Sequence, residues 1–246
     1  IKAARRFLET DRIARAEDEA RQLNAPAKWD RPPELIRSQD APHPLRAVAW
    51  NVQGHIPPDI IATYMSENSV DFLGITEHGI NVEDEHATSH IRRSLREAGL
   101  ACILARDGAL VYNQRKWAGA IAAGGTWVKA NGRIIAVRLV FGPNRSLALV
   151  SLYGIAGSSP ADSPRRDTLA ASLRDCLDTM HKGRTGLPTV CMGDLNDVTS
   201  SSPLDTLCEE GTAPAEPLPN SLTSTLLKDG YRSAVRKFWP TARLVS

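Results

Sequence analysis

The sequence predicts a layered α/β fold with antiparallel pairing mixed into the sheet. Short apolar runs alternate with helical segments from about Leu45 onward, which is typical of helices packed on sheets. Asn131-Gly132 is a strong hairpin signal, and the stretch GPNR at 142–145 makes a second turn. With 246 residues, 42% of them hydrophobic and 24% charged, the chain suits one large α/β domain or two small ones.

Residues 1–44 differ in composition from the rest. Residues 1 to about 28 alternate basic and acidic side chains with Ala and Leu at helical spacing, which predicts a solvated helix that packs poorly on a domain. A proline-rich connector follows. We therefore assign 1–44 to a charged helix and connector, and 45–246 to the folded domain.

In the first half of this domain, strands and helices alternate. LRAVAW is the first strand, a helix follows at about 58–68, DFLGIT is the next strand, and a second helix lies near 84–98. The helix at 58–68 carries Ile60, Ile61, Tyr64 and Met65 on one face. Two further strands are expected at 100–105 and 109–113.

The second half begins with a meander of strands from Gly125 to Tyr153. A helix then starts with Ser163 as its N-cap and Pro164 at its first position, and Gly183 ends it. Its apolar face comprises Leu169, Leu173, Cys176, Leu177 and Met180. The stretch LPTVCMGD is the last predicted strand.

Several functional classes are excluded by composition. Cys102, Cys176, Cys191 and Cys208 are widely spaced without a C-x-x-C pair, so we expect reduced thiols and an intracellular protein. No window approaches the roughly 18 apolar residues of a membrane span, so no membrane partner is expected. The net charge of +2 permits a phosphate-bearing partner without requiring one.

Polar residues end four of the predicted strands. They are Asn51 after LRAVAW, Glu77 after DFLGIT, Tyr153 after SLALVSL, and Asp194 with Asn196 after TVCMG. A lone Gly-Asp-x-Asn is usually a turn, because Asp and Asn side chains bond their own backbone. Ligands of α/β sheets bind at the carboxyl ends of strands, so we expect this set to line one cleft.

These residue types suit phosphoester hydrolysis. Glu77 is a hard-oxygen ligand for Mg²⁺, and Asn51 completes the metal shell or holds a metal-bound water. Asp194, unless it is itself the metal ligand, accepts a proton from the attacking water, while the Asn196 side-chain amide donates to a phosphoryl oxygen. Tyr153 adds a phenol at the same face. We therefore take Tyr153, Asp194 and Asn196 as catalytic and Glu77 and Asn51 as metal-binding.

The ordered motifs WNVQG, DFLGITEH, SLY and GDLND resemble the exonuclease-endonuclease-phosphatase superfamily over about 45–240. The resemblance implies a four-layer sandwich of two packed mixed β-sheets flanked by helices, as in deoxyribonuclease I. It also implies hydrolysis of phosphoesters with Mg²⁺, or with Mn²⁺ as the alternative ion. Asn51, Glu77, Tyr153, Asp194 and Asn196 match the corresponding family positions. One departure is YGIAGSSP, where Tyr-x-Pro is more usual.

MGDLNDVTSSSPLDTL and LLKDGYRSAVRKFWP are most similar to endonuclease domains of LINE-type (non-LTR) retrotransposons. This resemblance implies DNA as substrate, a downstream reverse transcriptase domain in the parent chain, and a nuclear location. The family ends with an Asp-His pair, whereas no histidine follows His181 here, and the chain starts at Ile1. We therefore expect a domain truncated at its C-terminus, with its last strands missing and little activity by itself.

Two other functions remain open. One is a phosphatase or phosphodiesterase of the same fold that acts on a small molecule or a lipid, since fold does not decide substrate. The other is a non-catalytic remnant that lacks the terminal Asp-His.

Other candidate sites have less support from the sequence than the polar residues at the strand ends. His86 and His90 have the i, i+4 spacing of helical metal ligands without an evident third ligand, so we interpret them as an exposed helix start. We interpret His78 as a residue behind the site or on the surface, and His55 as a loop residue. Three basic clusters suit either a phosphate backbone or solvated helix faces. They are Arg92, Arg93 and Arg96; Arg165 and Arg166; and Lys228, Arg232, Arg236 and Lys237.

Overall fold

The computed structural model describes residues 45–142, 145–156, 159–182, 186–197 and 220–232. The chain divides into two units, Ile1–Pro44 and Leu45–Ser246, and every described residue belongs to the second. The predicted N-terminal helix and its connector therefore lie outside the described residues. Among the helices that are described, none is long and apolar enough to cross a membrane.

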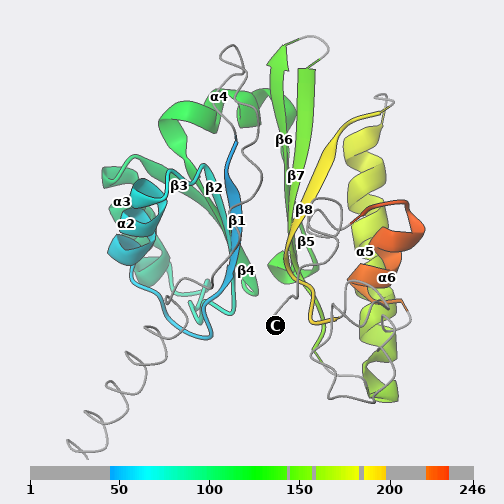
Figure 1. Ribbon diagram of the computed structural model, residues 1–246. Helices are drawn as coiled ribbons and strands as arrows, with labels where there is room; N and C mark the ends of the chain where they lie inside the picture. The colour runs from blue at the N-terminus through cyan, green and yellow to red at the C-terminus, as the bar shows by residue number, and fades with distance from the viewer. Residues whose placement is uncertain (1–44, 143–144, 157–158, 183–185, 198–219, 233–246) are drawn as a thin grey trace, which may run out of the picture. The chain divides into compact units, whose positions relative to one another are not determined.

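Two mixed sheets of four strands form the centre of the domain (Figure 1). Sheet A has the order β1 (Ala47–Asn51), β2 (Phe72–Thr76), β4 (Gly108–Asn113), β3 (Leu100–Leu104). Sheet B has the order β5 (Thr126–Lys129), β6 (Ile134–Gly142), β7 (Arg145–Tyr153), β8 (Thr189–Asp194). The pairs β1–β2 and β7–β8 are parallel, and the other neighbours are antiparallel.

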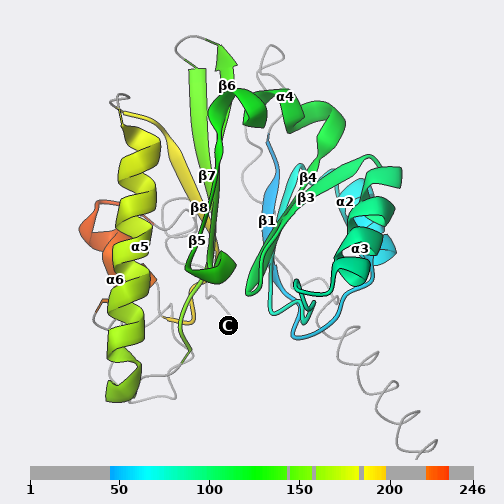
Figure 2. The same cartoon turned by 180° about the vertical axis from the view of Figure 1, so that it is seen from behind.

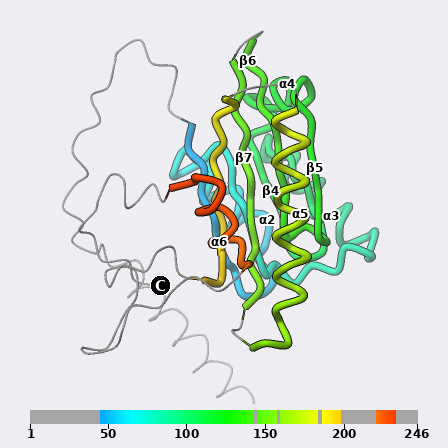
Figure 3. Tube along the Cα trace, turned by 90° about the vertical axis from the view of Figure 1, so that its right-hand side faces the viewer, coloured from blue at the N-terminus to red at the C-terminus, as the bar shows by residue number. Residues whose placement is uncertain are grey.

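Helices cover the outer face of each sheet. The helices α2 (Pro58–Glu67) and α3 (Glu85–Glu97) lie on sheet A, and α5 (Ser163–His181) and α6 (Leu222–Lys228) lie on sheet B (Figures 1 and 2). Seen from the side, α5 runs along sheet B with α6 beside it (Figure 3). The predicted four-layer sandwich is therefore confirmed.

The core between the sheets explains why they pack face to face. Phe72 and Leu110 of sheet A meet Ile135 and Leu149 of sheet B, and each is at most 1% exposed. The alternation of apolar residues along each strand sends every second side chain to this interface, which is the pattern of a strand buried between two layers.

Helix α4 (Gln114–Gly124) was not predicted from the sequence. Its segment contains two glycines, which weaken the local preference for helix. The Asn113 side chain caps it by accepting from the Lys116 amide at 3.1 Å. Trp117 and Ile121, one turn apart, are buried in the core between the sheets. Tertiary packing thus stabilises this helix more than propensity does. The short helix α6 was also missed.

The predicted hairpin at Asn131-Gly132 is present, but its connection has four residues instead of two. Lys129 pairs with Ile134, and a 3₁₀ turn at Ala130–Gly132 fills the connection. Asn131 and Gly132 both have positive φ angles, +58° and +92°, as their residue types favour. In the second predicted turn, Gly142 pairs with Arg145, and residues 143–144 lie outside the described residues.

Two details of the predicted helices are wrong. Ile60 does not share the buried face of α2, because 47% of its surface is exposed while Ile61 and Met65 are buried. Ser163 is the first residue of α5 and not its cap. A 3₁₀ turn at Pro160–Asp162 leads directly into the helix, so the chain is already helical when it reaches Ser163. The predicted apolar face of α5 is buried, as expected.

Candidate functional site

The ends of four strands meet because each sheet contributes a parallel pair. In sheet A, Asn51 at the end of β1 pairs with Thr76, the residue before Glu77. In sheet B, Tyr153 at the end of β7 pairs with Asp194 at the end of β8. Strands β1 and β8 lie next to each other across the two sheets. Parallel neighbours end at the same edge of a sheet, so these residues form one group.

Hydrogen bonds join this group directly. Asn51 Nδ2 donates to Glu77 Oε1 at 2.9 Å and to Asp194 Oδ2 at 2.7 Å. Tyr153 donates its phenolic proton to the same Glu77 Oε1 at 2.7 Å. All four side chains belong to half-buried residues, so solvent still reaches the group. We call these four residues the strand-end cluster.

Glu77 is held ionised at this position. The hydrogen bond from Tyr153 is the largest cause that lowers the pKa of Glu77 below its ordinary value, and the bond from Asn51 adds to it. Burial opposes this shift, and the positive charge of Arg133 supports it. The two neutral donors therefore stabilise the carboxylate form.

Burial, followed by the hydrogen bond to Glu77, raises the pKa of Tyr153 to about 12. The phenol is therefore protonated at neutral pH and acts as a hydrogen-bond donor. Its bond to Glu77 adds to the preference for the neutral phenol, since a phenolate beside the carboxylate would place two negative charges together.

The loops that carry the cluster have strained backbones. Glu77 has a φ of +56°, Gln53 of +47° and Asn196 of +50°, all in the left-handed region that non-glycine residues seldom adopt. Residues in such conformations persist where the surrounding structure holds them, and they concentrate at functional sites. Gly54 supplies part of this support by donating its amide to the Glu77 carbonyl at 2.7 Å.

Asp194 and Asn196 form a turn as well as part of the site. The backbone N–H of Asn196 donates to Asp194 Oδ1 at 3.0 Å, the usual geometry of an Asx turn. The other carboxylate oxygen of Asp194 faces Asn51. Asn196 Nδ2 donates to the Gly154 carbonyl at 3.2 Å, so this residue braces the neighbouring strand end.

Two glycines allow the chain to approach itself at the end of sheet B. A Cβ on Gly193 would collide with the Leu152 carbonyl, and one on Gly154 would collide with the Leu195 carbonyl. The glycine before Asp194 is therefore required by packing, and the sequence YG after β7 has the same origin.

Metal-binding capacity rests mainly on Glu77. Both hydrogen bonds to its carboxylate reach Oε1, and within the described residues none reaches Oε2. We predicted Asn51 among the metal ligands. Its nitrogen faces the two carboxylates, and its oxygen accepts from the Gln53 amide at 3.1 Å, which uses one of the two lone pairs of that oxygen. Three or more His, Cys, Asp or Glu side chains never gather in a metal-like group in the described part of the chain.

Arg133 was not predicted as a site residue from the sequence. Its guanidinium carbon lies 4.4 Å from the centroid of the Tyr153 ring, and its Nη1 donates to the Gly154 carbonyl at 2.8 Å. The register of the β6–β7 hairpin could have indicated it. Counting back from the turn at 142–145, with one bulge, places Arg133 opposite Tyr153, and the Tyr153 amide bonds the Arg133 carbonyl at 2.8 Å.

The four histidines considered as candidates from the sequence lie outside the cluster. His78 is 1% exposed; its Nδ1 accepts from the Ile80 amide, so its Nε2 donates to the Ala105 carbonyl at 2.9 Å. It is a buried residue that supports the loop after Glu77. His86 and His90 are exposed on α3, in line with our interpretation, and His55 is an exposed loop residue.

One of the basic clusters is divided. Arg165 is exposed whereas Arg166 is buried, so Arg166 does not belong to a solvated face. Arg92, Arg93 and Arg96 are exposed on α3. Arg236 and Lys237 lie outside the described residues.

Known structures match the fold, while no family model and no curated protein sequence matches the chain. An AP endonuclease from Archaeoglobus fulgidus superposes with a TM-score of 0.56 at 14% identity, over 82% of this chain and 77% of that one. A mannosyl-6-phosphatase from Bacteroides thetaiotaomicron gives 0.43 at 15% identity, over 63% and 66%. The human Nocturnin catalytic domain gives 0.41 at 14%, over 62% and 65%.

At these identities the similarity concerns the fold alone. Two of the three TM-scores lie below 0.5, so the comparison rests on the A. fulgidus structure. It covers most of both chains, and the two packed mixed sheets flanked by helices account for it. The domain therefore has the deoxyribonuclease I-like sandwich fold that it shares with this AP endonuclease.

Proposed function

We propose that this chain is a divalent-metal-dependent phosphodiester hydrolase and, more narrowly, a retrotransposon-type endonuclease that nicks DNA. One observation carries the proposal: a single amide, Asn51 Nδ2, donates to Glu77 of sheet A and to Asp194 of sheet B. Two carboxylates held this close repel each other unless positive charge or donors lie between them. Such a pair suits a site that receives a cation.

Glu77 fits Mg²⁺ as its protein ligand. The carboxylate is ionised, and Mg²⁺ commonly takes one or two carboxylates, keeps several waters and shares the substrate's phosphate. Glu77 would hold the ion, which would neutralise negative charge on the phosphate. In this assignment Asn51 positions both carboxylates through its nitrogen, and its oxygen completes the metal shell or holds a metal-bound water.

Asp194 is the proton acceptor. It takes a proton from the attacking water while the bond from water oxygen to phosphorus forms and the bond from phosphorus to the leaving oxygen breaks. Tyr153 stays protonated and holds Glu77. In this proposal its phenol also faces the phosphate. The second amide proton of Asn196 is the donor proposed for a phosphoryl oxygen, because the first is used on Gly154.

DNA is the proposed substrate for two reasons. The known structure on which the fold comparison rests is named an AP endonuclease. The sequence after Met192 resembles retrotransposon endonucleases. A reverse transcriptase domain in the parent chain and a nuclear location follow from the second reason and are part of the proposal.

The test is nicking of supercoiled plasmid with Mg²⁺ or Mn²⁺. It uses this chain and a longer parent, with Glu77→Ala and Asp194→Ala made in whichever is active. Each variant should lose about a hundred- to a thousandfold in rate, and EDTA should stop the reaction. Glu67→Ala, an exposed acidic residue at the end of α2, is the control and should keep full activity.

Full activity in either variant, or nicking that survives EDTA, would refute the mechanism. Hydrolysis of a small phosphoester such as bis(4-nitrophenyl) phosphate without any nicking would replace DNA by a small-molecule substrate. Loss of both activities in the parent would favour a binding module that keeps only the fold.

A further inference from the structure

Arg133 lies directly behind the strand-end cluster. It precedes β6 and sits opposite Tyr153, whose amide donates to the Arg133 carbonyl at 2.8 Å. The guanidinium carbon lies 4.4 Å from the Tyr153 ring centroid, the geometry of a cation stacked on an aromatic face.

The guanidinium is fixed by further bonds. Its Nε donates to Asp107 Oδ2 at 2.9 Å, and the two side chains are 20% and 25% exposed. Its Nη1 donates to the Gly154 carbonyl at 2.8 Å. A planar guanidinium with two bonds in different directions and a ring against its face has little freedom to move.

Asp107 is itself anchored. Its amide donates to the Asn131 carbonyl at 2.9 Å, which joins the β3–β4 loop to the β5–β6 connection. A chain of contacts therefore runs from Asp107 through Arg133 to the ring of Tyr153, and from its phenol to Glu77. Within the cluster, Asn51 donates to the same carboxylate oxygen of Glu77.

We propose that Arg133, held by Asp107, is a positioning residue that fixes the Tyr153 ring so that its phenol stays bonded to Glu77. It acts through Tyr153 and needs no contact with substrate. This inference rests on the proposed function for its kinetic consequences, but the ring position itself is independent of any activity.

The electrostatics agree with this geometry. The Arg133 charge lowers the pKa of Glu77 and opposes the rise in the pKa of Tyr153. The positive charge of Arg133 thus favours the carboxylate form of Glu77.

The chain contains a control five residues along, within β6. Arg138 also stacks on an aromatic ring, with its guanidinium carbon 5.6 Å from the Trp127 centroid, and its Nη1 donates to the Met180 carbonyl at 3.2 Å. Neither Trp127 nor Met180 belongs to the strand-end cluster. Both variants, Arg133→Met and Arg138→Met, remove a stacked guanidinium and a hydrogen bond to a carbonyl. Arg133→Met also removes the ion pair with Asp107, and only Arg133→Met touches the cluster.

The first measurement is ¹⁹F NMR of the full chain labelled with 3-fluorotyrosine, with Tyr153→Phe to assign the resonance. In Arg133→Met the Tyr153 signal should move toward the position of free 3-fluorotyrosine, whereas Arg138→Met should leave it in place. Arg133→Lys should give an intermediate shift, because the charge remains and the planar stack is lost. An unchanged Tyr153 signal in Arg133→Met overturns the proposal.

The second measurement is phosphodiester hydrolysis in whichever chain is active. We expect kcat to fall about tenfold or more in Arg133→Met with KM changed little, the pattern of a group that acts on the transition state. A rise in KM alone, with the ¹⁹F signal in place, would make Arg133 a substrate contact and refute the positioning role. If Arg133→Met does not fold, Asp107→Asn replaces it and must move the same ¹⁹F signal. Without any hydrolysis the proposed function fails, and the NMR result still decides the inference.

Discussion

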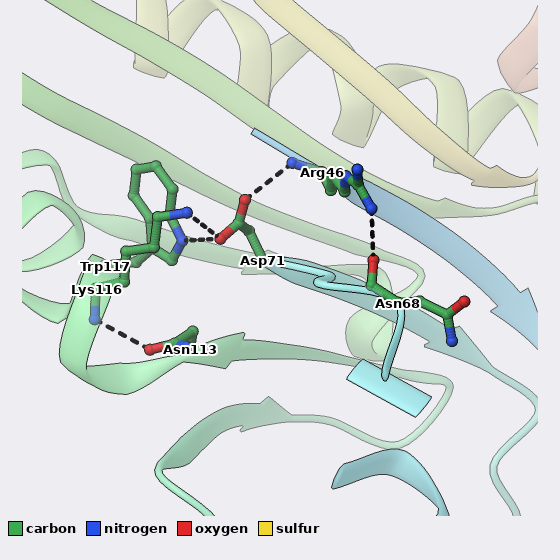
Figure 4. Close-up of polar contacts among 6 residues, drawn as sticks. All are labelled: Arg46, Asn68, Asp71, Asn113, Lys116 and Trp117. Atoms are coloured by element: carbon green, nitrogen blue, oxygen red, sulfur yellow. Dashed lines mark hydrogen bonds and ion pairs between the residues drawn. The ribbon is translucent and has the colours of Figure 1, made fainter. Parts of the chain in front are cut away.

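The two ends of β2 each carry an acidic residue, and their surroundings differ. Asp71, before the strand, is 5% exposed and accepts from the Arg46 amide at 2.9 Å, Lys116 Nζ at 2.6 Å and Trp117 Nε1 at 3.0 Å (Figure 4). Glu77, after the strand, is half-buried, accepts neutral donors on one oxygen, and has a strained backbone.

Their pKa values nevertheless shift in the same direction. Burial alone would raise the pKa of Asp71, but the bonds from Lys116, Arg46 and Trp117 hold it below its ordinary value. For Glu77 the bonds from Tyr153 and Asn51 outweigh burial. A lowered pKa therefore does not distinguish a structural carboxylate from a functional one. The distinction lies in the paired cation of Asp71 and in the second oxygen of Glu77.

The largest effect that the comparison predicts is on activity. Glu77→Gln should lower the hydrolysis rate about a hundred- to a thousandfold, because it removes the charge that would bind the cation. It should leave the free energy of unfolding nearly unchanged. Asp71→Asn should show the opposite pattern, so both variants are followed by a rate assay and by urea denaturation. Equal losses of rate in Glu77→Gln and Asp71→Asn would contradict the functional difference between the two carboxylates.

Asp71→Ala should mainly cost stability. It leaves the buried Trp117 indole N–H without its acceptor, and an unsatisfied buried donor costs about 1–3 kcal/mol. Lys116 adds little because its side chain is 39% exposed. We expect about 2 kcal/mol less free energy of unfolding, measured by urea denaturation. The double variant Asp71→Ala/Trp117→Phe tests the coupling. If its loss in free energy of unfolding equals the sum of the losses in the two single variants, the two side chains are not coupled.

Acid should weaken the fold through both carboxylates. A carboxylate whose folded pKa lies below its unfolded value contributes stability that is fully present above the unfolded value and is lost as pH falls through the folded one. For Asp71 that loss begins near its ordinary pKa of 3.8. Urea midpoints measured from pH 5 to pH 2 should therefore decline, and less steeply in Asp71→Asn. Glu77→Gln should flatten the curve less, since Glu77 is more exposed.

The smallest effect concerns the backbone of Glu77. Because its φ is +56°, Glu77→Gly should be more stable than Glu77→Ala by about 1 kcal/mol. Arg93 in α3 is the control, since there Gly should be less stable than Ala by about the same amount. A Glu77 pair that follows the order of the helix pair would show that the left-handed conformation carries no strain.

Much of the fold was accessible from the sequence because its strands and longest helices have clear periodicity. The strand ends at Asn51, Tyr153 and Asp194 were predicted at the right residues, and Glu77 follows its strand directly. Helix α4 was missed since its stability comes from Trp117 packing between sheets, which no local pattern announces. Arg133 was missed because its importance depends on hairpin register.

The sequence by itself determined which residue ends each strand, since apolar runs stop where a polar side chain follows. Only the tertiary structure decided what those residues do for one another. Asn51 and Asp194 are 143 positions apart, and no local rule specifies that one amide bridges carboxylates from two sheets. The same holds for Asp71 and Glu77, whose different environments come from side chains that the packing of sheets and helices brings to each end of β2.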